Sequence, residues 1–228
     1  MAHEGWQFVK YSFFKLAPEW KRLSFSEKDS GKKELTAVLD EFSDKMLVRS
    51  YSLTGIRGDT DFMLWLATPE VDMLQQLAAK INTTKIGPFL TIPYSYLAMT
   101  RRSMYIDSHS HAGQERLTVH PVGAKYLIVY PFVKSRPWYD LPKEKRQEMM
   151  NEHIGIGHKF PGVKINTSYS YGLDDQEFVL AFETNDLAEF LDLVMVLRET
   201  RASMYTVQDT PSFTCVSMDI GQALNMVG

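Results

Sequence analysis

Cysteine is nearly absent from this chain of 228 residues, in which Cys215 is the only one. A single cysteine cannot form a disulfide within the chain, and it excludes zinc sites built from several thiolates. A reducing compartment is therefore expected, and we predict a cytoplasmic protein. The N-terminus also lacks the basic start and the apolar core of a secretory signal.

A surplus of positive charge and a long apolar run are missing as well. The chain has 25 Lys and Arg against 28 Asp and Glu, and its formal net charge is -3. No basic surplus is available to neutralise nucleic-acid phosphates. No apolar run approaches the roughly 20 residues that cross a bilayer. We expect a protein that binds neither nucleic acid nor membrane, with one large or two small domains.

Common catalytic motifs are missing too, including the Walker loop, the dinucleotide glycine fingerprint and the nucleophile elbow. Clusters of two or more good metal ligands are also lacking. His109 and His111 stand two residues apart in a polar stretch, where a solvated loop is a simpler interpretation than a metal site.

Apolar periodicity predicts the same element order twice. The first half has strands at 6–16, 46–55, 61–68 and 91–100, with helices at 26–42 and 70–81. The second half has strands at 125–133, 164–172, 177–183 and 212–217, with helices at 141–159 and 187–201. Each half is β-α-β-β-α-β, so we predict an α+β protein with two ferredoxin-like halves whose sheets press together into a barrel.

An internal echo supports this repeat. TGIRGDTDFMLWLATPEVDMLQQL and YGLDDQEFVLAFETNDLAEFLDLV share a glycine turn, an acidic pair, an apolar strand and an acidic helix start. The stretch between the halves is polar and rich in Ser, His and Gly. We predict an N-terminal half at 1–105, a linker loop at 106–123 and a C-terminal half at 124–228.

The segment VYPFVKSRPWYDLPKEKRQEMMNEH, residues 129–153, places polar groups where apolar ones are expected. Tyr130 and Lys134 lie on a strand, and a helix follows that Asp140 can cap, with KEKRQE as a solvated face. A single buried stripe, directed toward the sheet, is then predicted from Met149, His153, Ile156 and Phe160, at i, i+4, i+7 and i+11. Burial of one unpaired polar group costs roughly 1–3 kcal/mol, so a polar ligand between strand and helix is indicated.

Each of these residues also has a simpler interpretation. A lone histidine on an apolar stripe is more often a satisfied core residue, and a strand tyrosine can keep its hydroxyl at a rim. Arg116 and Lys134 by themselves read as surface charges. A haem iron, however, needs only one axial protein ligand, because the porphyrin supplies four nitrogens. Propionates of such a porphyrin would require nearby cations, which Arg116 and Lys134 could supply.

The stretches KYLIVYPFVK, WYDLP, MMNEH and GLDDQEFVLAFET resemble the chlorite dismutase family, and within it the coproheme decarboxylases of haem biosynthesis. The resemblance implies a dimeric αβ-barrel chain, assembled into a homopentamer, with haem in the C-terminal half. It implies an oxidoreductase that uses hydrogen peroxide to decarboxylate iron coproporphyrin to haem b. By position, His153 resembles the proximal iron ligand and Tyr130 the redox-active tyrosine, while the propionate-binding positions fall on Arg116, Lys134 and Ser203.

One position departs from the dismutases of this family. They have a distal arginine on the strand before GLDD, where this chain has Ile165, or Asn166 if the register shifts by one. The position of the carboxylate beside the proximal histidine falls on Ala202. The resemblance therefore favours a decarboxylase over a chlorite dismutase or haem peroxidase. A haem-binding or haem-sensing protein without turnover is the alternative from another functional class.

Overall fold

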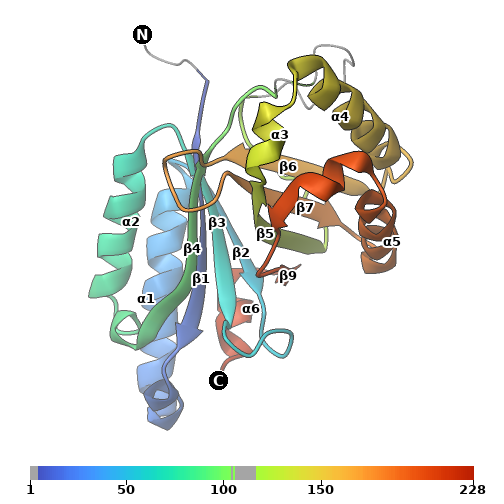
Figure 1. The fold of residues 1–228 in the computed structure, drawn as a ribbon. Coiled ribbons are helices and arrows are strands. Elements are labelled where there is room, and N and C mark those ends of the chain that lie inside the picture. Colours follow the sequence, from blue (N-terminus) through green and yellow to red (C-terminus); the bar gives the residue numbers. More distant parts are fainter. Residues whose placement is uncertain (1–4, 104, 106–116) are drawn as a thin grey trace. The chain divides into compact units, whose positions relative to one another are not determined.

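The computed structural model describes residues 5–103, 105 and 117–228 (Figure 1). The chain forms two compact units, which are residues 1–99 with 214–228 (unit 1) and residues 100–213 (unit 2). Within the described residues, no helix is both long enough and apolar enough to cross a bilayer.

Unit 1 is built on an antiparallel sheet in the order β4-β1-β3-β2-β9. Its strands are β1 (Phe8–Leu16), β2 (Leu47–Ser52), β3 (Phe62–Thr68), β4 (Leu90–Met99) and β9 (Phe213–Ser217). Its helices are α1 (Phe25–Ser43), α2 (Val71–Thr83) and α6 (Ile220–Asn225), with 3-10 turns η1 (Pro18–Arg22) and η2 (Gly87–Phe89). The β-α-β-β-α-β order predicted for the first half is present.

A continuous apolar core fills the space between the sheet of unit 1 and its helices. One face of β1 and β3 contributes Phe14, Leu16, Phe62, Leu64 and Leu66, which pack with side chains of α1 and α2 such as Leu35, Leu39, Phe42, Leu77 and Ile81. A capping box fixes the start of α1, because Ser24 accepts from the backbone of Glu27 while the Glu27 carboxylate accepts from the backbone of Ser24.

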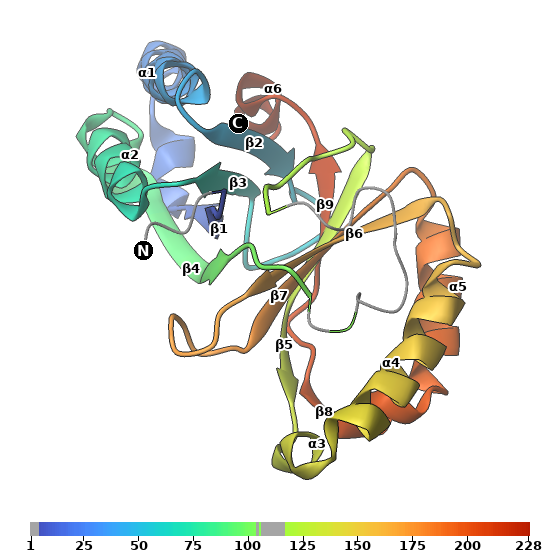
Figure 2. The ribbon, with the colours of Figure 1, turned by 90° about the horizontal axis from the view of Figure 1, so that it is seen from above.

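Unit 2 has an antiparallel sheet in the order β6-β7-β5-β8. Its strands are β5 (Tyr126–Lys134), β6 (Val163–Tyr169), β7 (Phe178–Thr184) and β8 (Thr206–Gln208). Its helices are α3 (Arg136–Asp140), α4 (Lys143–Gly157) and α5 (Leu187–Arg198), followed by the 3-10 turn η3 (Arg201–Tyr205). Figure 2 shows α4 and α5 side by side on one face of the sheet.

The start of α4 differs from the prediction. Asp140 ends the short helix α3 and does not cap α4, whose N-cap position is Pro142 without a side-chain cap. Leu141, between them, is extended with φ -66° and ψ 140°. A residue before proline is disfavoured in the helical region, so the chain leaves one helix before it enters the next.

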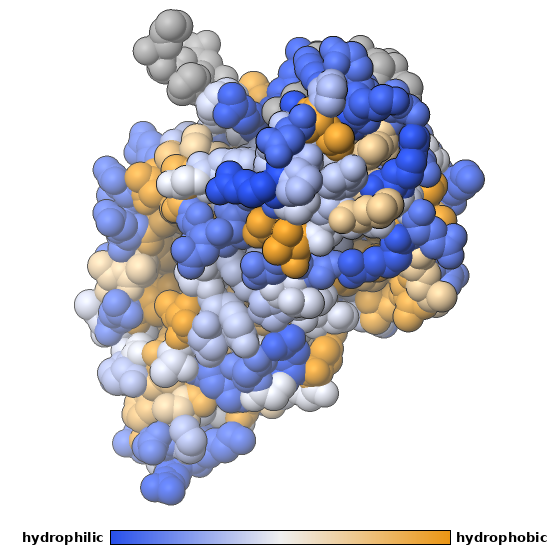
Figure 3. Space-filling view, viewed as in Figure 1, coloured by the Kyte–Doolittle hydropathy of each residue, from blue (hydrophilic) through white to orange (hydrophobic). Residues whose placement is uncertain are grey.

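The outward face of α5 is apolar. Leu187, Leu191 and Met195 follow one another at intervals of four residues and are 37%, 56% and 61% exposed. Apolar surface is visible around α5 in Figure 3. Such a stripe on a helix is typical of a surface that contacts another chain.

Candidate functional site

The strand residues of the candidate site lie on one face of the sheet of unit 2. Phe182 of that face contacts the ring of Phe190 on α5, with 5.2 Å between ring centroids, so this is the face that the helices cover. We call it the helix-side face. The strand register and the alternation of side chains place on it Ile128, Tyr130 and Phe132 of β5, Phe178, Leu180 and Phe182 of β7, and Ile165, Thr167 and Tyr169 of β6.

α4 is less buried against its sheet than α1 is in unit 1. None of the residues of α4 is buried, whereas α1 buries Gly31, Leu35, Leu39 and Phe42. The predicted inward stripe of Met149, His153, Ile156 and Phe160 is therefore only half-buried, and in this the prediction was wrong. Because no residue of α4 is fully buried, the apolar side chains of this stripe keep accessible surface that a ligand can cover.

His153 lies on α4 with a ring that is available to a metal. Its Nδ1 atom is buried and makes no hydrogen bond to any residue that the structure describes. Burial, helped by the positive charge of Lys134 and opposed by Glu152, lowers the pKa of His153 to about 4. The ring is therefore neutral near pH 7, which is the form that binds a metal ion.

Lys134 ends β5 and is held at its tip and at its backbone. Its Nζ donates to the carbonyl oxygen of Ala202 at 2.6 Å and lies 4.7 Å from the centroid of the Trp138 ring. Its backbone N–H donates to the Glu177 carboxylate at 2.7 Å. Burial lowers the pKa of Lys134 to about 8, although Glu177 opposes this effect. Lys134 thus remains cationic near pH 7.

Tyr130 lies on the helix-side face, where its ring stacks on Phe182 with 5.6 Å between centroids. Its hydroxyl makes no hydrogen bond with any described residue. Burial raises the pKa of Tyr130 far above its usual value, Asp209 adds to this effect and Arg198 opposes it. The phenol therefore keeps its O–H bond at physiological pH.

The strand register decides between Ile165 and Asn166. Ile165 pairs with Phe182 and shares the helix-side face. Asn166 points to the opposite face, where its amide donates to Glu183 at 3.1 Å. That buried carboxylate also accepts from the backbone N–H groups of Val122 and Gly123. The side chain of Asn166 is thus hydrogen-bonded on the opposite face of the sheet, and Ile165 occupies the position on the helix-side face.

The remaining predicted residues are not brought to this face in the same way. Ser203 lies in η3, where its hydroxyl hydrogen is shared between the carbonyl oxygens of Arg198 and Thr200, both at 2.7 Å. Its role toward a propionate requires that bond to break. Arg116, His109 and His111 lie outside the described residues. Ala202 is buried and offers only its carbonyl oxygen, to Lys134.

The residues present fit an iron porphyrin. A neutral histidine with a buried ring nitrogen that bonds to no described residue could supply the one axial ligand that haem iron requires. The half-buried helix-side face offers apolar surface for a flat macrocycle, and Lys134 offers a cation for a carboxylate. Among the described residues, no group of three or more His, Cys, Asp or Glu could hold a metal ion directly.

Sequence reasoning missed one cation of this region. It assigned Arg146 to a solvated face because KEKRQE is uniformly polar, but the Nε atom of Arg146 is buried and has no hydrogen-bond partner among residues 5–103, 105 and 117–228. Arg146 stands seven residues before His153, and that spacing, about two helical turns, is the signal that would have placed it inward.

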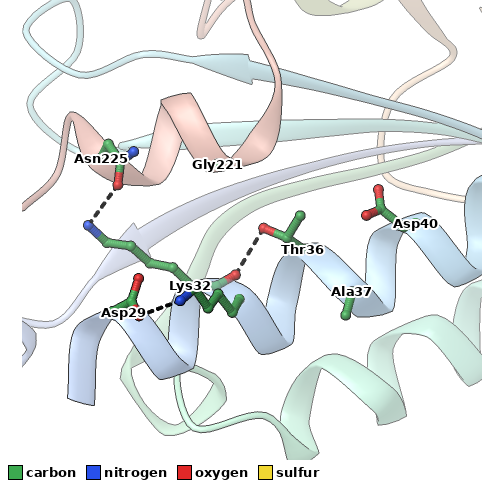
Figure 4. A pocket seen from close by; sticks show the side chains of 8 residues that line it. Asp29, Lys32, Thr36, Ala37, Asp40, Gly221 and Asn225 are labelled. Carbon is green, nitrogen blue, oxygen red and sulfur yellow. Dashed lines mark hydrogen bonds and ion pairs between the residues drawn. The ribbon is translucent and has the colours of Figure 1, made fainter. Parts of the chain in front are cut away.

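A shallow groove is present in unit 1 (Figure 4). Its lysines are already engaged, since Lys32 donates to Asn225 at 3.1 Å and Lys33 pairs with Asp29 at 2.8 Å. The groove therefore presents lysines that are less available to bind a ligand than the ring of His153 is. It is lined by Asp29, Lys32, Lys33, Thr36, Ala37, Asp40, Gly221 and Asn225.

Comparison with known proteins identifies the family to which this chain is similar. Residues 28–218 match the sequence profile described as chlorite dismutase. The chain belongs to the chlorite dismutase family. It is therefore a haem enzyme of that family, and the likeness extends to the fold. A structure of the chlorite dismutase from Candidatus Nitrospira defluvii in complex with imidazole has a TM-score of 0.87 and 24% identity, and covers 96% of this chain and 94% of that one.

Two relatives within the chlorite dismutase family differ in their distance from this chain. The coproheme decarboxylase of Mycolicibacterium smegmatis is 35% identical over 187 residues, which are 79% of this chain and 78% of that protein. The chlorite dismutase of Ideonella dechloratans is 26% identical over 206 residues, which are 88% of this chain and 72% of that protein. Of these two, the decarboxylase is nearer in sequence.

Proposed function

We propose that this member of the chlorite dismutase family is a coproheme decarboxylase, which uses hydrogen peroxide to convert propionates of iron coproporphyrin into the vinyl groups of haem b. The observation that carries the proposal is Tyr130, a protonated phenol on the helix-side face whose hydroxyl is not engaged by any described residue. The 35% identity to a coproheme decarboxylase, against 26% to a chlorite dismutase, supports the same activity.

The reaction balances for each propionate. One propionate, one hydrogen peroxide and one proton give one vinyl group, one carbon dioxide and two water molecules. Two electrons leave the propionate, and the peroxide that receives them is reduced to water. Bound iron would supply the redox centre at which peroxide is consumed.

Tyr130 is the relay in this proposal. Its phenol gives up an electron and a proton, and the resulting radical takes a hydrogen atom from the propionate chain. A second electron then leaves that chain, the bond to the carboxylate carbon breaks and carbon dioxide departs. Since burial keeps Tyr130 protonated, the transfer begins from an intact O–H bond.

The other residues bind and orient the porphyrin in this proposal. His153 holds the iron through a ring nitrogen. Lys134, near enough to His153 to lower its pKa, binds a propionate carboxylate. Arg116 and Ser203 bind further carboxylates, Ser203 after releasing the carbonyl oxygens of its own turn. Iron coproporphyrin carries four propionates, so several such groups are required.

A chlorite dismutase is the less favoured alternative. Retention of chlorite and hypochlorite beside iron is favoured by a cation on the distal side, and Ile165 has neither charge nor hydrogen-bonding group. Asn166 cannot replace it while its amide is bonded to Glu183. A haem-binding protein without turnover is the other alternative, and product formation distinguishes it.

The dimeric αβ-barrel and the homopentamer remain proposals that rest on family membership, and the boundaries at 105 and 124 remain proposals that rest on the sequence repeat. An oligomer would bury the apolar stripe of Leu187, Leu191 and Met195 on α5, which supports self-association.

The decisive experiment replaces Tyr130 with phenylalanine. Phe keeps the ring that stacks on Phe182, so coproheme affinity should stay within about tenfold, or about 1.4 kcal/mol. Decarboxylation should fall by far more, because the lost O–H group acts only during the reaction. Loss of the first propionate, followed by mass under excess peroxide, measures this.

Tyr139→Phe is the matched control. Tyr139 donates to Glu177 at 2.6 Å and lies 2.7 Å from the hydroxyl of Tyr171, so its substitution also removes one phenol hydroxyl, in this case a hydrogen-bonded one. This variant should retain turnover. If Tyr130→Phe converts coproheme at the parental rate, the relay role of Tyr130 is wrong. The chain would then be a haem-binding protein whose turnover follows a route that does not use Tyr130.

A further inference from the structure

Arg146 and His153 lie on the same side of α4. Seven residues make about two helical turns, so the two side chains leave the helix in nearly the same direction, about 10 Å apart along its axis. Both have a buried nitrogen that makes no hydrogen bond with the part of the chain that the structure describes, Nε of Arg146 and Nδ1 of His153. The exposed residues Lys145, Glu148 and Gly155 mark the other side of the helix.

The guanidinium of Arg146 makes no hydrogen bond and no ion pair with any described residue. Two of the three acidic side chains of α4 are paired with other cations, and the third, Glu144, is exposed. Glu148 pairs with Lys145 and with Arg201 at 2.8 Å, and Glu152 pairs with Arg201 at 2.9 Å. A guanidinium with a buried, unsatisfied donor destabilises the folded chain unless an anion reaches it.

We propose that Arg146 is a further substrate-binding residue that pairs with a carboxylate of the porphyrin held by His153. This inference rests on the proposed function, since it takes iron coproporphyrin as the substrate. The planar guanidinium matches a carboxylate through two parallel hydrogen bonds. With His153 at the iron, an arginine about 10 Å away along the same helix reaches toward the rim of the macrocycle, where the carboxylates are.

The test compares Arg146→Gln, Arg146→Lys and Lys145→Gln in the full-length protein. Lys145 is the matched control, because it is the adjacent cation on α4 and its side chain is 65% exposed. Affinity is measured by titrating each protein with ferric coproporphyrin III and with its tetramethyl ester, in which every carboxylate is neutral. Arg146→Gln should weaken binding of the acid about 10- to 100-fold and leave binding of the ester unchanged. The affinity of Arg146→Lys for the acid should lie between those of the parent and Arg146→Gln. The affinity of Lys145→Gln should match that of the parent.

Thermal unfolding of the porphyrin-free proteins gives a readout independent of the ligand. Arg146→Gln should melt at the parental temperature or above, because it removes a buried donor that lacks a partner. This result also shows that the variant folds.

Two outcomes would overturn the role of Arg146. One is an affinity of Arg146→Gln for the acid within twofold of the parent, and the other is an equal loss for the acid and the ester. Parental protein that binds no coproporphyrin would instead overturn the proposed function, and the role of Arg146 with it.

Discussion

Replacement of Lys134 with methionine should remove a pH-dependent part of the affinity for coproheme. Methionine keeps an unbranched stem beside Trp138 and removes the charge. In the porphyrin-free protein, burial lowers the pKa of Lys134 to about 8. A carboxylate bound to Nζ stabilises the protonated form, so binding raises that pKa. Between the two pKa values, binding takes up a proton and the affinity falls as pH rises.

The size of the effect follows from the contact that is lost. A hydrogen bond to a charged group contributes roughly 1.5–3 kcal/mol, so Lys134→Met should bind coproheme about 10- to 150-fold more weakly near pH 6.5. The two proteins should converge above pH 8, at up to about tenfold per pH unit, as Lys134 of the parent loses its proton.

Stability of the porphyrin-free protein should respond with the opposite sign. The folded-state pKa of Lys134 is lowered from 10.5 to about 8, so the unfolded chain binds more protons between these values. Stability therefore rises with pH through this window in the parent, and Lys134→Met lacks this contribution. Near pH 7 the variant loses the bond to Ala202 but no longer buries a charge. Because these effects oppose each other, its melting temperature should change little.

Absorption titrations between about pH 6.5 and pH 9.5 measure the affinities, and calorimetry in two buffers of different ionisation enthalpy counts the proton taken up. Lys125→Met, an exposed lysine beside the other end of β5, should keep the parental pH profile. The reasoning fails if Lys134→Met and the parent have parallel affinity profiles, or if the parent takes up no proton that depends on Lys134.

Two further predictions concern the iron. His153→Ala should abolish the absorption and resonance spectra of five-coordinate, histidine-ligated haem, whereas His158→Ala, at the C-cap of α4, should retain them; loss of ligation in His158→Ala alone would reassign the ligand. Oxygen release from chlorite by the haem-loaded protein should be negligible, because Ile165 occupies the helix-side position and carries no charge; sustained oxygen evolution, followed with an oxygen electrode, would contradict this.

The repeated element order was readable from the sequence because strand and helix periods depend on local spacing of apolar residues. β5, for example, was predicted at 125–133 and is found at Tyr126–Lys134. The short elements α3, β8 and α6 were not predicted, since so few residues show no period. The prediction that Asp140 caps α4 was wrong. Pro142 disfavours the helical conformation at Leu141, and this restraint outweighs the preference of Asp140 for a cap position.

Within the site, the spacing of apolar residues along one helix was enough to predict that His153 faces the sheet. The resemblance of short motifs was enough to identify the family. Contacts between distant segments required the fold. Strand pairing, which joins Ile165 to Phe182 and Asn166 to Glu183, decided which of two neighbours faces the helices, because a shift of one residue exchanges the faces of a strand. The unpaired guanidinium of Arg146 also became visible only in three dimensions. Whether a charged side chain has a partner depends on which side chains the fold brings close to it. A uniformly polar stretch of sequence does not indicate those partners.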